Sequence, residues 1–136
     1  MESILLRLVI SAVAGLAIGS IFKHRDTSRV FALICVGASL VTIISTEYFK
    51  ILELPWYSDP GRLSAQVISA LGFLGAGFIW ISDKKEVKGL AHSAALWYTA
   101  ILGMLIGIDL SNITIAVMIF AFALYLVGSL IISKWK

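Results

Sequence analysis

The sequence predicts an all-α membrane protein, a bundle of about five transmembrane helices that forms one domain over residues 1–136. Composition is the first observation: 60% of the residues are hydrophobic and only 14% are charged, against about 25% charged in soluble domains. A soluble domain this small exposes too much surface to hide that apolar excess. The second observation is that the apolar residues fall into five stretches of about 20 residues, the length that crosses a bilayer core.

The predicted spans are residues 4–22, 30–49, 63–81, 90–108 and 113–132. The first carries one charge, Arg7, the second has Glu47 near its end, and the fourth has His92 at its start. The third and fifth contain no formal charge. The last two spans are separated only by residues 109–112, which favours a tight antiparallel pair of helices. No apolar/polar alternation of the kind that a membrane barrel requires recurs along the chain.

The basic residues of the connecting segments predict an orientation. With five spans, one side of the membrane collects eight of them: Lys23, Arg25, Arg29, Lys84, Lys85, Lys88, Lys134 and Lys136. The other side collects three: Arg7, Lys50 and Arg62. Because cytoplasmic loops are enriched in Lys and Arg, we expect the N-terminus outside and the C-terminus in the cytoplasm.

Chemical motifs are scarce, so we expect no enzyme and no cofactor. There is no nucleophile–base pattern, phosphate-binding loop or CxxC motif. Cys35 lies in an apolar run, which favours a buried, inert thiol. His92 has only His24 and Cys35 as further ligands of its kind, so no metal site is predicted. A net charge of +3 without a basic face argues against nucleic acid as a partner.

Small residues at helical spacing predict where helices pack. Lipid gives helices no hydrophobic reason to associate, so close contact through small residues supplies much of the attraction. The predicted packing positions are Gly15, Gly19, Ser69, Gly72, Gly75, Ala76, Gly77, Gly103 and Gly107. The third span is richest in them, and we expect it at the centre of the bundle. A gate or substrate path at residues 72–77 is the alternative to plain packing.

A candidate polar site lies at the start of the third span, where Asp59, Arg62 and Gln66 occur together. Asp59 suits the positive end of the helix dipole, and Arg62 has two predicted partners on other helices, Asp109 or Glu47. Gln66 lies one turn inside the span and should face the bundle, because an amide in lipid is costly unless it is hydrogen-bonded. Its role is either an interhelical hydrogen bond or a contact with a substrate or ion.

Direct magnesium binding is a further alternative. Mg²⁺ prefers carboxylates in octahedral geometry and keeps several of its waters. No span holds two acids in its middle, so the only option is a loose cation-attracting rim formed by the outer acids Glu47, Glu53, Asp59 and Asp109.

Three sequence blocks resemble the MgtC/SapB family of membrane proteins. Residues 59–77, DPGRLSAQVISALGFLGAG, resemble the family pattern D-P-x-R-[IL]-A-A-Q-[IV]-[VI]-S-G-[IL]-G-F-L-G-A-G. Residues 87–90, VKGL, followed by AALW at 94–97, resemble V-[RK]-G-L-x-x-A-A-x-L-W. Upstream, Arg29 and the ALICVGA of residues 32–38 are similar to R-T-[HN]-x-L-V-x-x-G-A. The likeness covers roughly residues 15–107, in the right order.

The chain departs from the family pattern at three places. Where many members carry an acid after the first span, this chain has Ile21. Phe31 replaces the usual His or Asn, and Ala91 begins a pair that is usually polar. Members often add a cytoplasmic C-terminal domain, and we expect only the membrane domain here.

The resemblance implies a multi-pass protein of the bacterial inner membrane, linked to magnesium homeostasis, growth in low magnesium and, in pathogens, virulence. It also implies a membrane partner, since one member is described as restraining the F-type ATP synthase. We therefore expect a regulatory protein that acts by helix contacts with such a partner or with its own copy, as a homodimer or higher homo-oligomer. The alternative is a small Mg²⁺ or solute transporter, or a channel subunit, that acts as a homo-oligomer.

Overall fold

The computed structural model describes residues 2–22, 25–52, 59 and 61–134, with side chains described for residues 3–22, 26–47, 50–52, 59 and 61–124. Helices make up most of this part of the chain: α1 (Glu2–Ser20), α2 (Arg25–Ile51), α3 (Arg62–Gly77), α4 (Leu90–Ile108) and α5 (Asn112–Lys134). The prediction of a mainly helical chain is confirmed, and α4 has the bounds that the sequence predicted.

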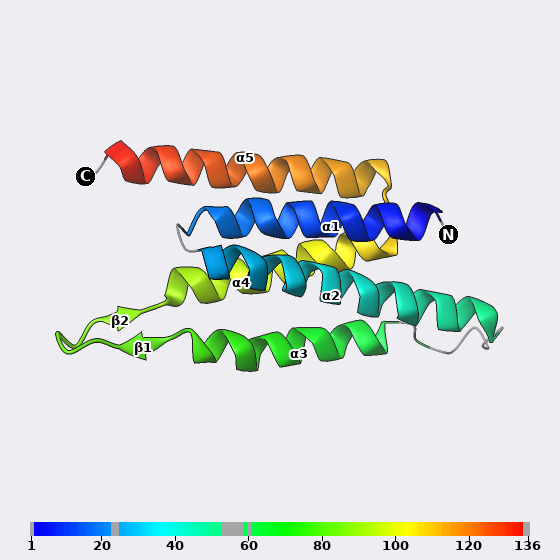
Figure 1. Ribbon diagram of the computed structural model, residues 1–136, viewed down its shortest axis with the longest axis horizontal. Helices are drawn as coiled ribbons and strands as arrows, with labels where there is room; N and C mark the ends of the chain where they lie inside the picture. Colours follow the sequence, from blue (N-terminus) through cyan, green and yellow to red (C-terminus); the bar gives the residue numbers. More distant parts are fainter. Residues whose placement is uncertain (1, 23–24, 53–58, 60, 135–136) are drawn as a thin grey trace.

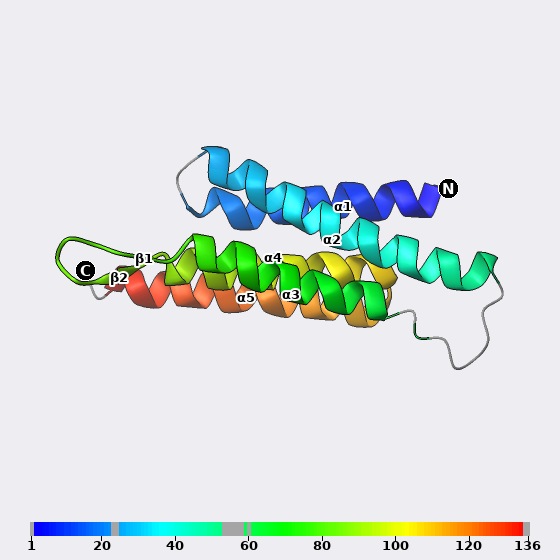
Figure 2. The same ribbon diagram turned by 90° about the horizontal axis from the view of Figure 1, so that it is seen from below.

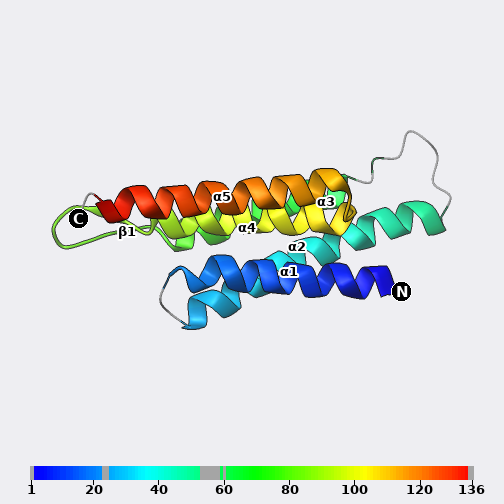
Figure 3. The same ribbon diagram turned by 90° about the horizontal axis from the view of Figure 1, so that it is seen from above.

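The helices lie side by side in two layers (Figures 1, 2 and 3). One layer is the antiparallel pair of α1 and α2. The other consists of α3, α4 and α5, with α4 packing against both helices of the first layer. The two ends of the chain lie at opposite ends of the bundle (Figure 1). We expected the third span at the centre, but α3 lies at the edge, and α2 and α4 occupy the middle.

Three of the described helical segments are long and apolar enough to cross a membrane: Ser3–Ser20, Asp26–Glu47 and Leu90–Ile108. The protein is therefore a membrane protein. In α5 the described side chains end at Leu124, so its apolar segment is followed only over Asn112–Leu124. The 16 residues of α3 measure about 24 Å at 1.5 Å per residue, less than a bilayer core of about 30 Å. Five crossings and their orientation stay predictions. The side chains of Lys23, His24, Arg25, Glu53, Lys134 and Lys136 lie outside the described residues.

The predicted third span, residues 63–81, is wrong at its end. Helix α3 stops at Gly77, and the chain enters a short antiparallel hairpin of β1 (Trp80–Ile81) and β2 (Val87–Lys88). Trp80 pairs with Lys88, and Ile81 pairs with Val87. Two causes act together: glycines at the helix end weaken the helix, and the aromatic and β-branched residues that follow favour a strand.

The core lies where α2, α3 and α4 meet. Its buried members are Phe31, Ala38, Leu71, Leu96 and Ala100. Partly buried side chains surround them from the helices and from the segments just after α1 and α3, among them Ile18, Phe22, Val67, Phe78 and Met104.

Glycines bring two helices against α2 at backbone distance. A Cβ added at Gly15 would lie 2.6 Å from the Cα of Ala32, and one at Gly19 would lie 2.6 Å from the Cα of Ser28. These contacts hold α1 against α2.

On another side of α2, Gly103 of α4 packs on the carbonyl of Cys35, and a Cβ at Gly107 would lie 2.6 Å from the carbonyl oxygen of Ser39. We call this contact, formed by Gly103 and Gly107 against Cys35, Ser39 and Thr42, the α2–α4 seam.

Candidate functional site

Helix α3 presents two faces of different character. Its inner face, which includes Leu71 and Gly75, is buried against the other helices. Its opposite face is exposed and carries polar and small residues among its apolar ones. We call it the outer face of α3 and define it by Arg62, Gln66, Ser69, Gly72, Phe73 and Ala76. In a membrane protein such a face meets lipid or another protein.

The structure places Gln66 and the glycines of α3 differently from expectation. Gln66 is exposed, so the prediction that it faces the bundle is wrong within this chain. A Cβ added at Gly72 or Gly77 would meet nothing within 4 Å, whereas one at Gly75 would lie 2.7 Å from the Oγ of Ser93. Of these three glycines, only Gly75 therefore serves packing inside the chain, and Ser69 and Ala76 are also exposed.

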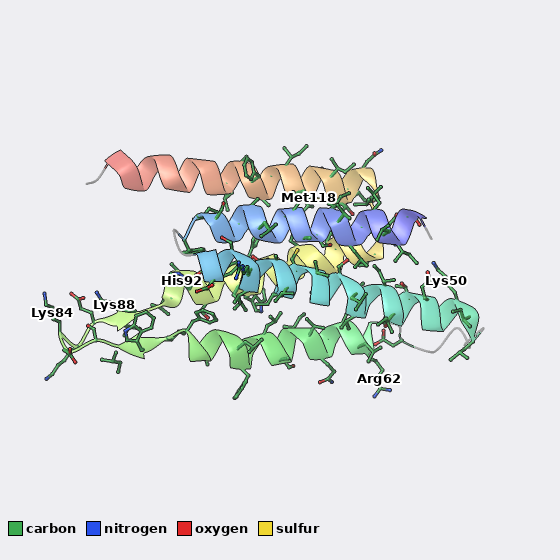
Figure 4. The ribbon with its side chains drawn as sticks, viewed as in Figure 1. Lys50, Arg62, Lys84, Lys88, His92 and Met118 are labelled. Atoms are coloured by element: carbon green, nitrogen blue, oxygen red, sulfur yellow. The ribbon has the colours of Figure 1, made fainter. Side chains whose placement is uncertain are left out.

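Asp59 organises the start of α3 locally. Its Oδ1 accepts a hydrogen bond from the backbone N–H of Gly61 at 2.7 Å, and its carbonyl oxygen accepts one from the N–H of Arg62 at 3.4 Å. The Arg62 side chain points away from the bundle (Figure 4). The two sequence-predicted partners of Arg62 are paired elsewhere: Asp109 with Arg7 and Glu47 with Lys50. Those two pairings of Arg62 are therefore wrong.

Arg7 binds the end of α4, an interaction that the sequence did not predict. Its Nη1 donates to the carbonyl oxygens of Gly107 and Ile108 at 3.2 and 3.1 Å, and its Nη2 lies 3.2 Å from Oδ1 of Asp109. The guanidinium thus satisfies carbonyls that have no partner within α4 and places a positive charge at the negative end of its dipole. A lone charge inside an apolar span signals such a partner.

Buried hydroxyl groups line the contacts of α2 and α4. Thr42 donates to the carbonyl of Ala38 at 3.0 Å, and its Oγ1 lies 3.4 Å from the Oγ of Ser64 on α3. Thr99 donates to the carbonyl of Ala95 at 2.7 Å. A bond of this kind to a carbonyl of the same helix satisfies the hydroxyl's hydrogen-bonding capacity without a partner on another helix. The Oγ of Ser39 is fully buried and has no hydrogen-bond partner among the described residues.

His92 lies in an aromatic cluster at the start of α4 (Figure 4). Its ring centroid is 4.1 Å from that of Phe22 and 6.4 Å from that of Phe78. The ring of Phe22 in turn lies 5.5 Å from that of Phe31. Within the described residues, no group of three or more His, Cys, Asp or Glu side chains is placed to hold a metal ion. The arrangement joins α2 and α4 to the segments that follow α1 and α3 by ring contacts.

An apolar groove of about 780 Å³ lies between α1, α4 and α5. Alanines line it on all three sides, among them Ala14 of α1, Ala94 of α4 and Ala121 of α5, and Met118 and Phe122 also line it from α5. A lining of this composition suits apolar groups.

Comparison with known proteins decides the family. The sequence model of the MgtC family matches residues 8–133. The chain belongs to the MgtC family. The resemblance seen in the sequence blocks is thereby confirmed, and the family block of residues 59–77 forms the turn at Asp59 and the whole of α3. No solved structure matches the chain.

Individual relatives in the MgtC family share about a third of their aligned residues with this chain. YhiD of Escherichia coli K12, named "Putative magnesium transporter YhiD", is 37% identical over 108 residues, which cover 76% of this chain and 50% of YhiD. SapB of Bacillus subtilis is 34% identical over 114 residues, 76% of this chain and 47% of SapB. MgtC of Brucella abortus is 37% identical over 90 residues, 65% of this chain and 35% of MgtC. The chain spans about half the length of the first two.

The three departures from the family pattern have different surroundings. Phe31 is fully buried in the core, where the pattern places a His or Asn. Ile21 is half-buried, and Ala91 is exposed at the start of α4. The departure at Phe31 therefore makes the core beside Phe22 more apolar than the family pattern implies.

Proposed function

We propose that this protein is a multi-pass protein of the bacterial inner membrane that acts in magnesium homeostasis without catalysis. It acts through lateral contact between the outer face of α3 and a helix of a membrane partner. The observation that carries this proposal is the outer face itself, where Gln66, Ser69 and Gly72 are exposed on a helix at the edge of the bundle.

The physical argument rests on what lipid does to such a face. The amide of Gln66 loses its hydrogen bonds to water in the membrane and is costly there without a partner. Ser69, Gly72 and Ala76 follow one another at spacings of three and four, so they leave a shallow track that a second helix approaches closely. A helix laid on this track gains van der Waals contact and supplies a partner for the amide.

Family membership supports the biological part of the proposal. The names of its relatives include a magnesium transporter and MgtC, and the sequence resemblance implies growth in low magnesium and an ATP synthase as one membrane partner. We place the N-terminus outside and the C-terminus in the cytoplasm, with five crossings, because the basic residues gather on one side.

Replacing Ser69 and Gly72 by Leu tests the proposal, because it fills the track at two exposed positions, and a Cβ at Gly72 would meet nothing within 4 Å. The matched control is Gly37→Leu, since Gly37 is exposed on α2 and a Cβ there also meets nothing within 4 Å. We expect the double variant to lose growth in low-magnesium medium and to lose partners retained in mild detergent, while the control keeps both. Normal growth and full partner retention in the double variant would refute the proposal.

A second candidate function is a Mg²⁺ or solute transporter or channel subunit built from several copies. The observation that favours it is that Arg62 and Gln66 on α3, and Asp59 just before it, are all exposed. Copies that gather with their α3 helices inward would therefore line a path with polar groups. Purified protein in vesicles should then show Mg²⁺ flux that Gln66→Ala abolishes. The absence of flux under an imposed Mg²⁺ gradient excludes this version for Mg²⁺.

A further inference from the structure

The hairpin between α3 and α4 is a defined structure. The N–H of Ser82 donates to the carbonyl of Glu86 at 2.9 Å, and the N–H of Lys85 donates to the carbonyl of Ser82 at 2.8 Å. The Oγ of Ser82 also accepts the N–H of Glu86 at 3.3 Å. Lys85 adopts a left-handed conformation with φ of 61°, as in hairpin loops that end a turn with one left-handed residue. The tip of the hairpin is therefore held in one shape.

The base of the hairpin is fixed to the end of α3. Gly89 has φ of 87°, and its Cα packs on the carbonyl of Phe78, so that a Cβ at this position would overlap the carbonyl group. Only glycine combines that dihedral angle with that approach. The hairpin thus projects from the bundle at a fixed place, in line with α3 and beyond the ends of α1 and α2 (Figures 1 and 2).

The exposed residues of this hairpin are of two kinds. Trp80, Ile81 and Val87 on the strands are 56%, 73% and 55% exposed. Lys84 and Lys85 lie in the exposed tip beside Asp83, and Lys88 is 3.4 Å from Glu86, which partly neutralises it. Lys84 and Lys88 extend into open space (Figure 4). An apolar base and a cationic tip occur on one rigid element.

The length of α3 sets the depth of the hairpin in the membrane. At about 24 Å, α3 falls short of a bilayer core of about 30 Å, so the apolar strands come next along the crossing. Unpaired strand edges are not tolerated in the hydrocarbon, and Trp concentrates at the level of the headgroups. With α3 as a crossing, these two preferences would put the strands at the interface and the lysines of the tip among or beyond the headgroups.

We propose that the hairpin of residues 80–88 is an interfacial anchor that binds anionic lipid headgroups. Trp80, Ile81 and Val87 pack at the boundary of headgroups and acyl chains, and the ammonium groups of Lys84 and Lys85 contact lipid phosphates. The apolar strands favour a lipid over a free anion, because they gain contact only where acyl chains are present. This proposal takes α3 as one of the five proposed crossings, but it does not depend on a partner at the outer face of α3.

The test uses the full chain in vesicles of phosphatidylcholine that contain spin-labelled lipids. It measures the association constant of phosphatidylglycerol relative to phosphatidylcholine. The variant is Lys84→Gln combined with Lys85→Asn, since Asn tolerates the left-handed conformation at position 85. The matched control is Lys50→Gln, which removes an exposed lysine at the other end of the bundle (Figure 4). Helical content by circular dichroism checks that both variants fold.

We expect the wild type and Lys50→Gln to select phosphatidylglycerol, and the double variant to lose about fivefold in relative association per lysine removed. Selection should also weaken as salt is raised. An unchanged preference in the double variant, or an equal loss in Lys50→Gln, overturns the proposal. Competition by inorganic phosphate as strong as that by the lipid overturns it as well, because the tip is then a site for a free anion.

Discussion

The α2–α4 seam and the outer face of α3 share a similar spacing of small residues, but the first is buried and the second is exposed. Both carry small residues three or four positions apart. In the seam, Gly103 and Gly107 meet the carbonyls of Cys35 and Ser39, while Gly72 on the outer face meets nothing within 4 Å. A small-residue pattern therefore indicates that a helix is suited to close approach, but not whether the approaching helix belongs to the same chain.

The difference in burial also separates residues that stabilise the single chain from residues that are free to bind a partner. Substitutions in the seam act on the stability of the single chain, because they change contacts that folding forms. Substitutions on the outer face leave those contacts intact and act on what the chain binds. The following predictions test this distinction, from the largest expected effect to the smallest.

Gly107→Leu and Gly72→Leu form the sharpest pair. At Gly107 the new side chain meets the carbonyl oxygen of Ser39, which lies 2.6 Å from the added Cβ, and overpacking of this kind costs about 1–3 kcal/mol. We expect a loss at the upper end of that range, or failure to fold. Gly72→Leu should change the unfolding free energy by less than about 1 kcal/mol. Unfolding in mixed micelles measures both, and equal losses would contradict the distinction.

Arg7→Gln tests the polar end of the seam. The variant loses the charged hydrogen bonds to Gly107 and Ile108, and hydrogen bonds of charged groups contribute about 1.5–3 kcal/mol when buried. We expect a loss of about 1–2 kcal/mol, because Arg7 is partly accessible. A double-mutant cycle with Asp109→Asn should give a coupling below about 1 kcal/mol, since Asp109 is 64% exposed and exposed pairs are screened. A stability equal to that of the wild type would show that the cap is dispensable.

Ser39→Ala probes the inside of the seam. The variant removes a buried hydroxyl that has no partner among the described residues, so the unfolding free energy should stay the same or rise by up to about 1 kcal/mol. Ser11→Ala is the matched control, because Ser11 is equally buried and donates to the carbonyl of Arg7 at 2.9 Å. The control should lose about 0.5–1 kcal/mol. Equal losses in the two variants would show that Ser39 is hydrogen-bonded in solution.

Gln66→Leu has the smallest expected effect on stability. Because Gln66 is exposed, its replacement should change the unfolding free energy of the single chain by less than about 0.5 kcal/mol. Growth in low-magnesium medium should nevertheless fall, since the amide is lost from the contact face. A loss of more than about 1 kcal/mol of stability would place Gln66 inside the bundle, as the sequence alone suggested.

The sequence by itself determined that this protein is suited to a lipid bilayer, and it determined where along the chain the helices lie. Apolar runs of bilayer length predicted α4 to the residue and the other helices to within a few residues at most ends, because the length of an apolar run is a local property that lipid selects directly. The family blocks also predicted the family correctly.

Only the tertiary structure decided which helices pack together and which partners the charges take. Arg7, not Arg62, reaches Asp109, because the approach of α1 to the end of α4 depends on how glycines at residues 15, 19, 103 and 107 fit α2. The place of the hairpin beyond α3 was decided in the same way, by the contact of Gly89 with the carbonyl of Phe78. Such contacts join residues far apart in the chain, and no local pattern specifies them.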